Sequence, residues 1–204
     1  MYVKPADGSA DERLLTDQPG VPTSWSKDGR FLLYQSADPK TLNDLWVLPD
    51  PAGATGNARS VPYLRTEFSE AAAQFSPDGR WVAYTASESG NTDVFVRPFY
   101  PDRIPQSAAG GKWLISKGGA GNARWRRDGK ELYYGDTTLQ VSAVDIRADK
   151  TLEPGIPRRL FALPLLNGFD ITQDGTRFIV SMPEGANAPS PFTVVTNWQA
   201  ALAK

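Results

Sequence analysis

The sequence predicts an all-β protein made of β-propeller blades, with four antiparallel strands in each blade and about four blades in the chain. Three observations predict this fold. Four segments repeat the same order of β-prone run, Asp-Gly turn and β-prone run, and their turn aspartates are separated by 50, 50 and 46 residues. Further β-prone runs follow each segment, and nothing keeps a period of 3.6 residues apart from a short helical end at 199–203. Short strands repeated at this interval are typical of propeller blades.

Each repeated segment predicts a β-hairpin. Asp-Gly between two β-prone runs is a strong hairpin signal, because Gly accepts a positive φ and Asp bonds to the backbone of its own turn. The four turn aspartates are Asp28, Asp78, Asp128 and Asp174. We interpret them as turn-forming residues rather than metal ligands, because turns that occur once per blade would be spaced around a ring instead of converging on one ion.

Additional β-prone runs complete the expected blades. The third runs are 45–48, 94–97, 139–144 and 192–195, and the fourth runs are 63–64, 113–115 and 160–161. Large residues stand at constant offsets on both sides of the turns, which a recurring packed layer requires. A β-sandwich is the alternative, but it does not demand the same turn and the same offsets four times.

The turn motif also resembles a known family of repeats. The order Ser-x-Asp-Gly-Arg-hydrophobic, at Ser26–Phe31 and Ser76–Trp81, resembles the WD-like repeats of TolB-type propellers, although Arg126 and Thr172 replace the Ser in the later units. Similar blades occur in the C-terminal propeller regions of some bacterial Ser/Thr kinases, which the stretch Phe192–Trp198 also resembles. The resemblance implies peptide or protein partners and a periplasmic or otherwise extracytoplasmic parent protein. The residues themselves leave the compartment unknown.

We expect one propeller module over residues 1–204. Its expected parts are strands three and four of a split blade (1–16), three blades (17–65, 66–117 and 118–163), an incomplete last blade (164–198) and a tail (199–204). An open arc of four blades would leave apolar faces in water. We therefore predict a homodimer that closes an eight-blade ring, each chain donating the strand at 13–16 to the last blade of the other. The chain is also expected to be a fragment of a longer protein, and both hypotheses can hold together.

Composition limits the expected chemistry. The chain has no His and no Cys, which excludes Ser-His-Asp and Cys-His catalysis, His-ligated zinc and disulfides. There is no Gly-x-Ser-x-Gly elbow, and the basic cluster at 124–130 is interpreted as a solvated blade edge. The formal charge is −1 and no run approaches the ~20 apolar residues of a membrane span. We therefore expect no cofactor, no metal, no nucleic-acid or membrane partner and no enzymatic activity.

The central channel is the best candidate site, because the innermost strand of every blade converges on it. The residue four positions before each turn aspartate belongs to that strand and is polar in every unit: Ser24, Gln74, Arg124 and Asp170. These residues are the candidate ligand contacts. The alternative is that they bond to one another and to water, with Arg124 and Asp170 as an ion pair between neighbouring blades.

The sequence therefore predicts a non-catalytic scaffold that binds a protein or peptide, or acts as a sensor, and that associates with itself. The alternative from another class is a carboxylate- or metal-dependent hydrolase or lyase that works in the channel. That reading would need converging acids, and Asp170 is the one acid evident on an inner strand.

Overall fold

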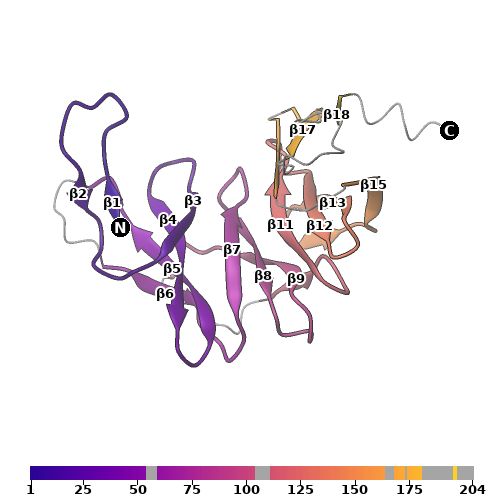
Figure 1. The fold of residues 1–204 in the computed structure, drawn as a ribbon, viewed down its shortest axis with the longest axis horizontal. Helices are drawn as coiled ribbons and strands as arrows, with labels where there is room; N and C mark the ends of the chain where they lie inside the picture. Colours follow the sequence, from indigo (N-terminus) through magenta and orange to yellow (C-terminus); the bar gives the residue numbers. More distant parts are fainter. Residues whose placement is uncertain (54–58, 104–110, 164–167, 173, 181–194, 197–204) are drawn as a thin grey trace, which may run out of the picture.

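The computed structural model describes residues 1–53, 59–103, 111–163, 168–172, 174–180 and 195–196. These residues form strands, turns and bends without a helix, so none of them belongs to a helix that could cross a bilayer. Four antiparallel sheets follow one another along the chain in an open arc, with a two-stranded sheet at the N-terminal end (Figure 1). The predicted all-β fold of antiparallel four-stranded sheets is confirmed. The expected helical end at 199–203 lies outside the described residues.

The first, second and last sheets are meanders in which consecutive strands pair. The first sheet contains β3 (Val21–Trp25), β4 (Phe31–Asp38), β5 (Leu42–Pro49) and β6 (Val61–Leu64). The second contains β7 (Glu70–Phe75), β8 (Trp81–Ala86), β9 (Asp93–Pro98) and β10 (Trp113–Leu114). The last sheet contains β16 (Phe169–Ile171), β17 (Arg177–Val180) and β18 (Val195–Thr196), and the two-stranded sheet pairs β1 (Tyr2–Val3) with β2 (Arg13–Leu14).

The third sheet departs from this plan. It contains β11 (Ala120–Trp125), β12 (Glu131–Asp136), β13 (Gln140–Ala148), β14 (Leu152–Pro154) and β15 (Arg158–Ala162). The first half of β13 pairs with β15, whereas its far end, from Ile146 to Ala148, pairs with β14. The far end of β13 and β14 therefore form an additional hairpin, and Leu152 from this hairpin is buried in the hydrophobic cluster between the second and third sheets.

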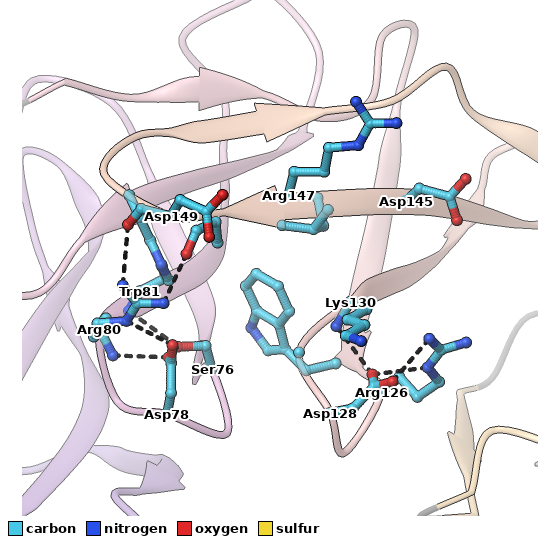
Figure 2. A pocket seen from close by; sticks show the side chains of 14 residues that line it. Ser76, Asp78, Arg80, Trp81, Arg126, Asp128, Lys130, Asp145, Arg147 and Asp149 are labelled. Carbon is cyan, nitrogen blue, oxygen red and sulfur yellow. Dashed lines mark hydrogen bonds and ion pairs between the residues drawn. The ribbon is translucent and has the colours of Figure 1, made fainter.

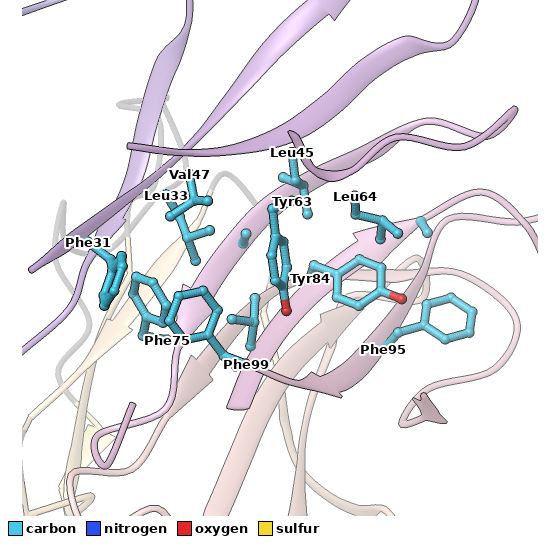
Figure 3. Packing of buried hydrophobic residues seen from close by; sticks show 13 residues of the cluster. Phe31, Leu33, Leu45, Val47, Tyr63, Leu64, Phe75, Tyr84, Phe95 and Phe99 are labelled. Atoms are coloured by element: carbon cyan, nitrogen blue, oxygen red, sulfur yellow. The ribbon is translucent and has the colours of Figure 1, made fainter. Parts of the chain in front are cut away.

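The hydrophobic core consists of layers between neighbouring sheets. One layer combines Phe31 and Tyr63 of the first sheet with Phe75 and Tyr84 of the second (Figure 3). A second layer joins the second and third sheets, and a third layer joins the third and last sheets. All six residues of β8 are buried, and so are all six of β9. Strands in the middle of the arc are thus covered on both faces, which explains why apolar residues stand at consecutive positions in β8 and β9 instead of alternating with polar ones.

The buried carboxyl group of Glu70 is expected to make the stability of the protein depend on pH. Glu70, at the start of β7, is fully buried; its Oε1 accepts a hydrogen bond from the Thr66 hydroxyl, and its Oε2 has no partner among the described residues. Burial raises the pKa of Glu70 from 4.5 to about 7, and the nearby carboxylates of Asp44 and Glu88 act in the same direction. Ionisation is therefore disfavoured in the folded state.

We expect the free energy of unfolding to fall as the pH rises from about 5 to about 8, because Glu70 ionises more readily in the unfolded chain. When the pKa of a carboxyl group is higher in the folded protein than in the unfolded chain, its contribution to stability is complete below the unfolded-state pKa. That contribution is lost as the pH rises through the folded-state pKa. Glu70→Gln should reduce this fall when urea unfolding is measured at both pH values, whereas the exposed neighbour Glu67→Gln should not. An equal fall in Glu70→Gln and the parent protein would contradict the prediction.

Candidate functional site

The inner strands of the arc bring the predicted contact residues onto neighbouring sheets. Strands β3, β7, β11 and β16 are the first strands of the four sheets, each in contact with the next, and β3, β7 and β11 lie toward the inside of the arc (Figure 1). Each of these three contains a β-bulge directly before the predicted contact residue. A bulge removes residues from the strand ladder, so their backbone groups need other partners.

Side chains of the first sheet accept hydrogen bonds from backbone N–H groups of the second. The Ala72 N–H, at the bulge of β7, donates to Gln35 Oε1 at 3.0 Å, and Ala72 has a φ of 51°. The Phe75 N–H donates to Ser24 Oγ at 3.1 Å. Gln74 is half-buried on β7 between these two positions. The Ser24 hydroxyl therefore links two sheets by accepting a hydrogen bond from the backbone of the second.

The third and last sheets are linked in a similar way. Arg124 Nε lies 3.5 Å from Asp170 Oδ1, so the ion pair between neighbouring blades is present. Arg124 Nη1 also donates to the Ala123 carbonyl at 2.9 Å, and Asn122 Nδ2 donates to the Phe169 carbonyl at 3.3 Å. The structure thus brings Arg124 and Asp170 together and engages both in contacts between sheets. A role of Ser24, Gln74, Arg124 and Asp170 in ligand contact stays a prediction.

The turn aspartates act within their own turns. In the first turn the Ser26 hydroxyl donates to Asp28 Oδ1 at 2.6 Å, and the Arg30 N–H donates to the same oxygen at 3.1 Å. The Ser26 hydroxyl is the main reason why the pKa of Asp28 is lowered. In the last turn Thr172 takes the place of Ser and holds the pKa of Asp174 at about 2. The glycine after each aspartate has a φ between 70° and 75°.

The third turn replaces the hydroxyl with a guanidinium. Arg126 Nε donates to Asp128 Oδ1 at 2.8 Å, and its Nη1 donates to Glu131 Oε2 at 2.5 Å. Glu131 is buried, and it also accepts hydrogen bonds from the Tyr133 hydroxyl at 2.7 Å and from Arg158. The interpretation of 124–130 as a solvated blade edge is therefore wrong for Arg126, because a buried carboxylate requires a cation beside it.

Two adjacent cavities lie beside the turns, and sequence reasoning missed both. The first cavity, of about 490 Å³, lies between the first turn and the second. Its apolar lining residues are Phe31, Pro77, Phe99 and Pro101. The second, of about 550 Å³, separates the second turn from the third, and Trp81 and Trp125 line it (Figure 2). The far end of β13 borders the second cavity. The length of the 139–154 stretch was the signal that could have indicated this additional hairpin.

Comparison with known proteins supports the fold. No family model matches the chain, and no curated protein matches it. TolB from Acinetobacter baumannii is 16% identical with a TM-score of 0.61, over 90% of this chain and 43% of that one. A putative TolB from Agrobacterium tumefaciens is 19% identical with a TM-score of 0.60, over 79% of this chain and 56% of that one. The chain thus spans about half the length of these two solved structures.

Enzymes are also among the similar structures. XC5397 from Xanthomonas campestris, described as a gluconolactonase, is 15% identical with a TM-score of 0.57, over 90% of this chain and 61% of that one. The expectation that this chain is not an enzyme is therefore contradicted, because propellers of the same architecture include enzymes. The missing His and Cys exclude particular chemistries and leave carboxylates, Lys, Tyr and Ser available, and a fold does not fix a function. At these identities the comparisons establish the fold alone: the chain has the TolB-type, WD-like β-propeller fold that its repeats predicted.

Proposed function

We propose that this chain is a protein-association module, in which a second copy completes the propeller ring and the ring binds a protein or peptide partner. One observation carries the proposal. Strands β8 and β9 in the middle of the arc are buried on both faces, whereas Val21 and Trp25 of the first sheet and Ile179 of the last sheet are exposed. Apolar surface of this kind, at positions that repeat a buried position elsewhere in the fold, favours association with another protein surface.

The N-terminal end shows this contrast at one repeated position. Trp25, Phe75 and Trp125 each stand three residues before a turn aspartate. Phe75 and Trp125 are 8% and 9% exposed, but Trp25 is 43% exposed. Val21 on the same strand is also exposed. The side of the first sheet that faces away from the second is thus covered less than the equivalent side of the inner sheets.

The opposite end of the arc also exposes an apolar residue, Ile179. In β17, Phe178 and Val180 are buried against the third sheet, while Arg177 and Ile179 point away from it and Ile179 is 58% exposed. In the described part of the chain the last sheet has three strands, one fewer than the second sheet. A second copy that packs its first sheet on this face and pairs β2 (Arg13–Leu14) with the β18 edge of this sheet would bury both ends at once, with two-fold symmetry.

Light scattering after size exclusion tests the proposal. We expect the mass of two chains for the parent protein, and the mass of one chain for Ile179→Glu, because a charge in the centre of the apolar contact would be desolvated. Ile156→Glu is the matched control and should leave the mass unchanged, since Ile156 is exposed in the connection between β14 and β15 and belongs to neither end sheet. A stable parent protein with the mass of one chain would contradict the proposal and indicate that another polypeptide covers these faces.

A further inference from the structure

We propose that the turns of the four sheets form a docking surface for an acidic, extended peptide. We define the turn rim as residues 26–30, 76–80, 126–130, 172 and 174–176. The proposal rests on the proposed role in binding a protein or peptide partner, and it assigns that partner to a surface other than the channel. Three features carry it: the turns are adjacent, their charge is unbalanced, and two cavities open between them.

The turn rim is continuous along the arc. Asp78 and Arg80 of the second turn line both cavities, so this turn forms the wall between them. The third and last turns are in contact, because a Cβ placed on Gly175 would lie 2.7 Å from Arg126 Cδ. An extended chain that crosses the second turn would therefore reach both cavities.

The charge of the turn rim is positive. It holds six basic residues and four acidic ones. The carboxylates of all four aspartates accept a hydrogen bond from the backbone N–H two residues later, at 3.0 or 3.1 Å, so their negative charge is already solvated by the turns. Lys27, Arg30 and Lys130 are exposed. Asp145, Arg147 and Asp149 also line the second cavity, outside the turns. Since the whole chain carries a formal charge of −1, the excess of positive charge belongs to the turns themselves and favours a ligand that contacts them directly.

Both cavities offer apolar contacts, and two hydrogen-bond donors that lack a partner in the described part of the chain are buried beside the second. Phe31 and Phe99 line the first cavity. Trp81 and Trp125 line the second, and their indole N–H groups are buried without an acceptor among the described residues. Figure 2 shows Asp78, Arg80 and Trp81 on one side of this cavity and Arg126, Asp128 and Lys130 on the other. Buried donors without partners are costly, so an acceptor that reaches these N–H groups is favoured.

An acidic peptide meets all of these requirements. Its carboxylates complement Lys27 and Lys130, which lie on either side of the second turn, its backbone carbonyls are acceptors, and its apolar side chains are large enough to fill the cavities. An extended peptide also follows a row of turns without covering the rest of the sheet edges. A nucleic acid would need more phosphate contacts than these few cations supply.

Fluorescence anisotropy with short labelled peptides of Glu, Gly and Leu tests the proposal, with Lys or Gln in place of Glu and a single-stranded oligonucleotide as comparison probes. We expect the Glu peptide to bind, and more weakly at high salt. The double variant Lys27→Ala/Lys130→Ala should weaken binding about tenfold, as expected for the loss of charge-assisted contacts. Lys40→Ala/Lys117→Ala removes two exposed lysines outside the turn rim and should change the affinity by less than about twofold.

Each outcome has a defined meaning. Binding of the Glu peptide that depends on Lys27 and Lys130 supports the proposal. Binding that survives their removal, or a preference for the Lys peptide or the oligonucleotide, overturns the turn rim as an acidic-peptide surface while leaving the association with a second copy intact. If no peptide of any charge binds, the docking surface and peptide binding both fail. Scattering on the same samples separates these results from a failure of ring closure.

Discussion

Replacing Phe99 by alanine is expected to lower the free energy of unfolding by about 3–5 kcal/mol, the range for a buried Phe truncated to Ala. Phe99 follows β9 in the second sheet, and its ring centroid lies 4.9 Å from Phe75, 5.1 Å from Phe31 and 5.8 Å from Tyr63 (Figure 3). Two of these partners belong to the first sheet. The truncation would therefore leave a cavity at the contact between two blades, where the rigid strands on both sides limit relaxation.

Urea unfolding followed by circular dichroism measures this effect. Tyr100→Ala is the matched control, because Tyr100 is the next residue along the chain and its ring is exposed. We expect the control to change stability by less than about 1 kcal/mol. Equal losses in both variants would show that Phe99 does not join the first and second sheets.

Glu131→Ala is expected to lower the free energy of unfolding by about 1–3 kcal/mol, the range for leaving a buried hydrogen-bonding group without its partner. The Glu131 carboxylate is buried and accepts hydrogen bonds from Arg126, Arg158 and the Tyr133 hydroxyl. Its removal leaves a buried hydroxyl and two guanidinium groups without their shared acceptor. The loss also disturbs the last turn, since Gly175 lies against Arg126 and the Tyr133 hydroxyl.

The same unfolding measurement tests the Glu131 prediction. Glu153→Ala, at an exposed position of β14 in the same sheet, should stay within about 0.5 kcal/mol of the parent protein. Glu131→Gln keeps the size of the side chain and should recover part of the loss, because an amide oxygen still accepts a hydrogen bond but carries no charge. A loss of less than about 1 kcal/mol in Glu131→Ala would contradict the importance of this cluster.

Local chemistry made the blades predictable. The Ser26, Asp28 and Gly29 turn needs only its own residues: a hydroxyl and a carboxylate that bind nearby N–H groups, and a glycine at a φ of 75°. The same contacts form around Ser76 and Asp78. Because these interactions join residues within five positions of one another, the sequence motif was sufficient to predict both hairpins.

The surroundings of the candidate site were much less predictable. The sequence placed Ser24, Gln74, Arg124 and Asp170 on inner strands, but their partners come from neighbouring sheets. The Ser24 hydroxyl meets the Phe75 N–H, 51 residues away. The second cavity depends on the far end of β13. The sequence repeats do not predict that this segment lies over the second sheet. The expectation that the chain is not an enzyme was wrong because missing residue types limit chemistry without identifying a function.

The turns, the order of the strands and the propeller fold could be predicted from the sequence, since short-range hydrogen bonds and a recurring apolar pattern specify them. Contacts between distant parts of the chain specify which polar groups pair between sheets, where cavities open beside the turns, and why one repeated position is buried at Trp125 but exposed at Trp25. These properties depend on which surfaces meet. A side chain is buried by residues that are far away in the chain. The repeat specifies the strands and turns of each blade but not the surface that packs against it.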